Sequence, residues 1–197
     1  MVAIKITGDA LWARMERAVD RVEDRLRRAV AALEEAGVPY AVVGGLAVRV
    51  WVAQVDEAAA RTTRDVDVLI RRNDLDTIKQ AMQRVGFIYR EVAGICLFLD
   101  GPEAKPRDAV HLVFSEEMVR EDDPEPNPSV ERYTMVGDLR TIDLETLVRM
   151  KLNAYRLKDR VHVLDMLEVG LIDATWVGRL PAVFAQRLQS LIDNPDG

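Results

Sequence analysis

The segment Arg64–Ile70 places the tightest limit on how this chain can fold. Its charged and aliphatic residues alternate, as they do in a strand with one buried face. Side chains two positions apart point to the same face of a strand, so Asp65 and Asp67 project together. Two nearby carboxylates repel each other unless a cation lies between them. The segment therefore predicts a half-buried strand that carries a candidate magnesium site, because Mg²⁺ prefers hard oxygen ligands.

A second motif, Gly44-Gly45, follows directly after the apolar run Tyr40–Val43, which we predict to be a short buried strand. Glycine lets the backbone approach a ligand closely, and the amides of a helix that starts there can bind phosphate oxygens. This motif has two interpretations, a seat for a triphosphate or merely a tight turn. The Asp-x-Asp pair also has a second interpretation, the solvated edge of a half-buried sheet.

The other periodicities predict a mixture of helices and strands. Leu46–Ala60 fits either type of element, and its length and alanine content favour a helix. Asn73 is expected to cap the helix that follows it. The acidic, proline-containing stretch 115–129 is expected to be a solvated loop. The remaining expected helices cover 11–33, 74–85, 144–157, 159–169 and a stretch to 192 that is interrupted at Pro181; the remaining strands cover 87–92, 95–99 and 109–114.

The predicted fold class is α+β with α/β-like character, a small mixed sheet flanked by helices and followed by a helical C-terminal part. We expect one compact unit with three segments: a long N-terminal helix in 1–38, a core in 39–141 and a helical part in 142–197. The apolar stripe of the long helix fits either core packing or the seam of a homodimer.

Composition narrows the partners and the compartment. With 27 basic and 33 acidic residues the net charge is −6, which does not support general capture of nucleic acid. The single cysteine cannot form an internal disulfide, which fits a reducing compartment. No uncharged stretch reaches the ~20 residues that span a bilayer, and Met1–Asp9 lacks a signal-peptide core. We therefore expect a cytoplasmic protein with no membrane partner.

Taken together, Val43-Gly44-Gly45 and Arg64-Asp65-Val66-Asp67-Val68 resemble the signature of nucleotidyltransferases of the DNA polymerase β type. Within that superfamily the chain looks most like the compact bacterial branch that includes the AbiEii-type abortive-infection toxin enzymes. This finer resemblance depends on the segment Leu147–Leu152 and on the step formed by Arg156, Lys158 and Asp159. It covers roughly Tyr40 to Asp173.

The resemblance implies Mg²⁺-dependent transfer of a nucleoside monophosphate from a nucleoside triphosphate (NTP) to an acceptor. The sequence does not identify this acceptor, which can be RNA, a protein or a small molecule. In the implied roles, Asp65 and Asp67 hold the metal, Gly44 and Gly45 seat the phosphates, Lys151 contacts a phosphate, and Arg61, Arg64 or Lys151 offsets charge as pyrophosphate leaves. A solvated helix face is the alternative interpretation for Lys151.

The chain departs from the family pattern at one position. A third carboxylate is expected on a later strand, and the matching position in Ala109–Phe114 is His111. Three outcomes stay open: Asp108 substitutes from the strand edge, His111 joins Asp65 and Asp67 as a catalytic or metal-binding group, or the site binds nucleotide without transferring it. The alternative function is therefore a catalytically silent nucleotide- or partner-binding module, similar to an antitoxin.

Overall fold

A seven-stranded mixed sheet forms the centre of the structure, a computed structural model that describes residues 8–196 apart from the Arg107 side chain. The strand order is β3-β4-β5-β2-β1-β7-β6. β1 pairs parallel with β7, and β2 pairs parallel with β5, whereas the other neighbours are antiparallel. The expected α+β fold class is confirmed. The strands are β1 (Tyr40–Val43), β2 (Val66–Ile70), β3 (Ile88–Val92), β4 (Ile95–Leu99), β5 (Ala109–Phe114), β6 (Tyr133–Val136) and β7 (Leu139–Ile142).

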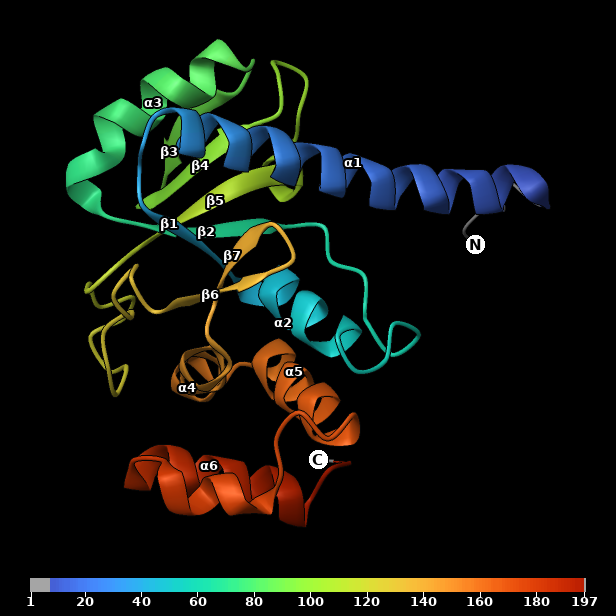
Figure 1. Ribbon diagram of the computed structural model, residues 1–197, viewed down its shortest axis with the longest axis vertical. Coiled ribbons are helices and arrows are strands. Elements are labelled where there is room, and N and C mark those ends of the chain that lie inside the picture. Colours follow the sequence, from blue (N-terminus) through green and yellow to red (C-terminus); the bar gives the residue numbers. More distant parts are fainter. Residues whose placement is uncertain (1–7, 197) are drawn as a thin grey trace.

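Helices cover both faces of the sheet (Figure 1). One face packs against α1 (Asp9–Glu35) and α3 (Leu75–Arg84). The opposite face packs against α2 (Gly44–Ala53) and α4 (Leu144–Ala154), with α5 (Leu157–Glu168) and α6 (Ala182–Asp193) beyond them. Short 3₁₀ turns lie at Arg72–Asp74, Pro106–Asp108 and Ala174–Arg179.

Each face of the sheet has its own apolar core, because strand residues alternate between the faces. Val66, Val68 and Ile70 of β2 point into the core shared with α1 and α3. Leu69 points into the other core, which α2, α4, α5 and α6 complete. This alternation places Asp67 on the same face as Leu69, toward α2 and α4, as the sequence predicts.

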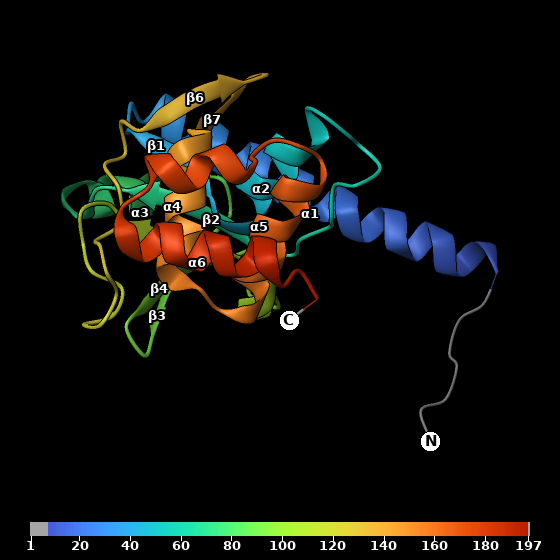
Figure 2. The ribbon, with the colours of Figure 1, turned by 90° about the horizontal axis from the view of Figure 1, so that it is seen from below.

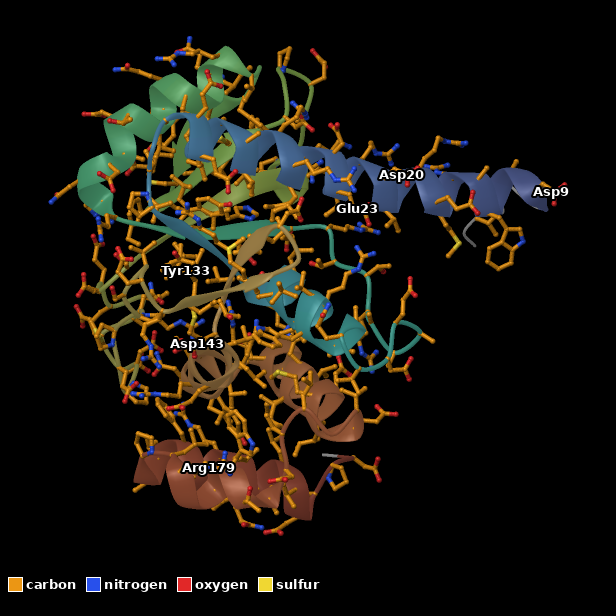
Figure 3. All side chains as sticks on the ribbon, in the orientation of Figure 1. Asp9, Asp20, Glu23, Tyr133, Asp143 and Arg179 are labelled. Carbon is orange, nitrogen blue, oxygen red and sulfur yellow. The ribbon has the colours of Figure 1, made fainter. Side chains whose placement is uncertain are left out.

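The first half of α1 extends beyond the body of the molecule in both ribbon views (Figures 1 and 2). Asp9 lies at its far end and Asp20 nearer the sheet (Figure 3). The second half packs against the sheet, where the buried Arg25 donates to the backbone oxygen of Arg64 at 3.2 Å. Arg25 also pairs with Asp100 at 3.5 Å. The start of β2 is thus fixed from the α1 side.

Two local predictions were wrong, and one hairpin was missed. The helix expected over 46–60 ends at Ala53, because the Asp56 side chain accepts from the amides of Ala58 and Ala59 in a turn that competes with the helix. Asn73 does not cap α3, since it lies inside a 3₁₀ turn. The hairpin of β6 and β7 was not predicted, although the Gly137-Asp138 step between two short alternating runs signals one.

The division into segments 1–38, 39–141 and 142–197 stays a prediction, and residues 1–7 lie outside the described part of the chain. The homodimer seam on the long helix is likewise untested. Within residues 8–196, no helix has the length and apolar character that a membrane crossing requires.

Candidate active site

The two carboxylates of the Asp-x-Asp motif lie at the start of β2. Asp67 is in register with Val43 at the end of β1 and with His111 in β5. The parallel register puts Asp67 and His111 on the same face, and His111 Nδ1 lies 3.7 Å from Asp67 Oδ1. The position at which the resemblance leads us to expect a third carboxylate is therefore adjacent to the motif in space.

Gly44 brings the glycine motif into direct contact with Asp67. β1 ends at Val43, and α2 begins at Gly44, whose φ of +71° lies in the left-handed region. A Cβ atom at Gly44 would lie 1.9 Å from Asp67 Oδ2. Only glycine fits there without displacement of the carboxylate. At Gly45 a Cβ would lie 3.2 Å from Thr63 Oγ1, which is tight but not prohibitive.

These residues line a cavity of about 860 Å³ between the sheet and the C-terminal helices. Gly44, Gly45, Asp65 and Asp67 contribute from the sheet side, and Lys151 contributes from α4. The volume is typical of a site for a small-molecule ligand. The cavity thus brings together five of the residues that the sequence singles out.

Lys151 and Asp159 form a buried ion pair in the cavity wall, with side chains 6% and 1% exposed and an Nζ to Oδ1 distance of 3.3 Å. Arg156 caps α5 and donates through Nε to Asp159 Oδ2 at 2.6 Å. Burial alone would raise the pKa of Asp159, but these two cations bring it below its usual value. Burial lowers the pKa of Lys151 despite Asp159 and Asp67.

The surroundings of Asp67 disfavour the charged form of its carboxyl group. Burial raises the pKa of its carboxyl group, and the neighbouring Asp65 adds to this effect. The charges of His111, Lys151 and Lys158 oppose the shift without cancelling it. A bound divalent cation would favour the charged form.

The donor set suits magnesium in one particular mode. In the described part of the chain, no group of three or more His, Cys, Asp or Glu side chains is placed to hold a metal ion. Asp65 and Asp67 fit instead the mode in which Mg²⁺ binds one or two carboxylates together with substrate phosphates. The residues present are therefore compatible with a magnesium ion that arrives with a nucleotide.

Four of the candidate site residues lie outside the cavity lining. Arg61 donates through Nε to both carboxylate oxygens of Asp165, at 2.8 Å each. Arg64 is exposed. His111 contacts Asp67 from the side of β5. Asp108 lies in the 3₁₀ turn that precedes β5.

Sequence reasoning did not assign several residues that the structure places in the cavity wall. Thr62 and Thr63 reach it because Arg61 attaches their segment to α5. His162 also lines the cavity; its Nδ1 is buried without a hydrogen-bond partner, and burial lowers its pKa to about 4. The loop between β5 and β6, expected to be merely solvated, forms one whole side. No local pattern signals such a wall, because it depends on the tertiary position of the loop.

Three comparisons relate this chain to known proteins. Residues 10–163 match the model of a protein family described as "Uncharacterised nucleotidyltransferase". No curated protein sequence matches the chain significantly. The solved structure of the antibiotic-resistance factor ANT(2'')-Ia has a TM-score of 0.52 and 13% identity, over 87% of this chain and 91% of that one. A candidate nucleotidyltransferase from H. pylori has a TM-score of 0.50 and 16% identity, over 92% of this chain and 79% of its own.

Proposed function

Because this chain belongs to the family of uncharacterised nucleotidyltransferases, we propose that it transfers a nucleoside monophosphate from an NTP to an acceptor in a Mg²⁺-dependent reaction. One observation carries the proposal: Gly44 and Asp67, 23 positions apart in the sequence, touch in the wall of a large cavity. The acceptor, whether RNA, protein or small molecule, is not identified.

In the proposed mechanism an acceptor hydroxyl attacks the α-phosphorus of the NTP. A new phosphorus–oxygen bond forms to the acceptor, and the bond between the α-phosphorus and the oxygen that bridges it to the β-phosphate breaks. Pyrophosphate leaves with the electron pair, and the hydroxyl proton is released to solvent. Asp65 and Asp67 would hold the magnesium, which when bound stabilises negative charge on the phosphate oxygens. Gly44 and Gly45 are the first residues of α2, whose free amides would bind phosphate oxygens.

Two lysines would offset the charge of the leaving pyrophosphate. Lys151 is held in the wall by Asp159, and the exposed Lys158 lines the same cavity. We assign this role to them in place of Arg61, which Asp165 engages, and Arg64, which does not line the cavity. Such positioned cations stabilise charge that develops in the transition state.

The Asp-x-Asp pair provides the test. Asp65→Asn and Asp67→Asn are each expected to weaken Mg·NTP binding by at least about tenfold, because each removes a ligand charge. Unfolding temperature without metal should stay equal or rise, since carboxylate repulsion is relieved. Asp138→Asn, in the β6–β7 turn, is the control. Calorimetry that finds unchanged Mg·NTP affinity in both cavity variants would refute the site.

The second candidate function is a silent nucleotide- or partner-binding module, and the histidine beside Asp67 favours it. Imidazole is a poorer ligand for Mg²⁺ than a carboxylate. If the missing carboxylate is the defect, native protein binds Mg·NTP but transfers slowly, and His111→Asp raises transfer measured with a labelled NTP. Rapid transfer by native protein with no gain in His111→Asp would eliminate the silent module.

The finer assignments are part of the same proposal. A place near the AbiEii-type toxin branch is supported because Lys151, Arg156, Lys158 and Asp159 all line the cavity, where Asp159 pairs with Lys151 and Arg156. A cytoplasmic location and a homodimer through the long helix are proposed with it.

A further inference from the structure

The cavity has two ends of different chemistry, set by the strand directions. β1 runs antiparallel to β2, and β5 runs parallel to β2. Gly44 and Asp67 therefore lie at the same end of these strands. The loop of residues 115–129 leaves β5 at the opposite end of these strands, where the amide of Ser115 donates to the Ile70 oxygen at 2.8 Å. Ile70 lies three positions after Asp67 along β2, a span of about 10 Å.

The walls differ between these ends. Glycine amides, threonine hydroxyls, carboxylates and Lys158 surround the Asp67 end, as phosphates require. The loop end combines apolar residues with polar and charged ones, the latter being Arg120, Asp123, Glu125, Asn127 and Ser129 of the loop. Its apolar lining residues are Val113, Val119, Pro126, Pro128, Leu147 and Met150. Apolar walls suit a flat heterocycle with polar edges better than they suit a phosphate chain.

The loop is held in place before any ligand binds. The Glu125 amide donates to Asn153 Oδ1 at 3.1 Å, and Asn153 Nδ2 donates back to the Glu125 oxygen at 2.8 Å. Arg149 Nη2 donates to both carboxylate oxygens of Glu125, at 2.8 and 2.6 Å. Asn127 Nδ2 donates to the Phe114 oxygen at 2.9 Å. Such preorganisation lowers the entropic cost of binding.

We propose that the loop 115–129, clamped on α4 by Asn153 and Arg149, forms the nucleoside subsite of the cavity, with the triphosphate at the Gly44 end. This inference rests on the proposed function. It assigns the loop and Met150, instead of the Asp-x-Asp end, to the recognition of the base and sugar.

The experiment compares a whole NTP with its phosphate part alone. Calorimetry in Mg²⁺ would measure the Kd of each of the four NTPs and of inorganic tripolyphosphate. In native protein at least one NTP should bind about tenfold more tightly than tripolyphosphate, because apolar burial adds to the phosphate contacts. Asn153→Ala and Met150→Ala should remove most of that difference and change tripolyphosphate affinity less than about twofold.

Two controls accompany these variants. Asp122→Ala truncates a residue of the same loop that does not line the cavity, and it should leave both affinities unchanged. Met150→Leu retains the apolar volume and should restore most of the NTP preference.

Unchanged NTP affinity in both cavity variants would overturn the inference and leave the loop as a wall for the acceptor. Equal weakening of NTP and tripolyphosphate would also overturn it, since the loop would then have no nucleoside-specific role. Native protein that binds neither ligand would refute the proposed function itself, which is a separate result.

Discussion

At the scale of single residues, Gly44 faces the strictest requirement in the candidate site. Its backbone is left-handed, and its missing side chain leaves room for the Asp67 carboxylate. We expect Gly44→Ala to abolish Mg·NTP binding and to lower the free energy of unfolding by about 2–4 kcal/mol, through strain plus the clash. Urea unfolding and calorimetry measure the two effects.

Gly137 is the matched control for this prediction. Its φ of +63° carries the same backbone penalty, but a Cβ there would meet nothing within 4 Å. Gly137→Ala should therefore cost only about 1 kcal/mol and leave binding intact. Equal effects of the two substitutions would show that the contact with Asp67 is unimportant.

His162 should make stability depend on pH. Its folded pKa is about 4, below the ordinary 6.5, so between these values the unfolded chain binds more protons than the native one. Its stabilising contribution is complete above pH 6.5 and is lost as pH falls toward 4. Asp67, whose pKa is raised, acts in the opposite direction. Urea unfolding of native protein and of His162→Gln at pH 7 and pH 5 isolates the effect of the histidine. When the pH falls from 7 to 5, the variant should lose less stability than native protein. An identical loss in both proteins would contradict the assignment.

At the scale of elements, the ion pair between Arg61 and Asp165 attaches the segment after α2 to α5. The Asp165 side chain is 8% exposed and that of Arg61 64%. Loss of Arg61 would leave a buried carboxylate unpaired, so Arg61→Ala should cost about 1–2 kcal/mol. It should also weaken NTP binding, because Thr62 and Thr63 would no longer be held beside Gly45.

Asp165→Asn distinguishes this tether from direct contact between Arg61 and nucleotide. If the arginine acts by holding the segment, Asp165→Asn weakens NTP affinity about as much as Arg61→Ala does. If Arg61 itself binds phosphate, its release in Asp165→Asn leaves NTP affinity equal or higher. Calorimetry on both variants decides between the two roles.

Much of the fold could be predicted from the sequence where a pattern is local. The alternation in β2 gave the strand and its polar face, and the residues flanking Gly44 gave a strand followed by a helix. The cluster of Asp65, Asp67 and Gly44 could be predicted because each motif has its own chemistry. Two features could not be predicted because they depend on contacts between distant residues. Arg61 pairs with a residue 104 positions away, and the loop 115–129 is held by residues up to 28 positions away.

At the scale of the whole molecule, Arg25 links the two sides of the sheet. It is 4% exposed, reaches the Arg64 oxygen from α1, and thereby fixes the start of the strand that carries the carboxylates on the other face. We expect Arg25→Ala to lower the free energy of unfolding by about 2–3 kcal/mol. Arg28 still pairs with Asp100, which limits the loss.

Arg27→Ala is the control for this substitution, since Arg27 is an exposed neighbour on the same helix. It should change stability by less than about 0.5 kcal/mol. Thermal unfolding of the two variants measures the effect on stability. A separate measurement of NTP binding tests whether the contact from α1 also affects the cavity. Equal stability of the two variants would show that the buried guanidinium contributes nothing net.

The parallel pairing of β1 with β7 also determines when the cavity can exist during protein synthesis. Val42 pairs with Thr141, so the β7 side of the sheet is completed only after residue 141 has been made. A ribosome that has released residues up to β5 has delivered both aspartates and both glycines, but neither α4 nor α5. Long-range pairing of this kind slows folding. A nascent chain therefore carries the metal-binding motif well before it carries a pocket that can retain a nucleotide.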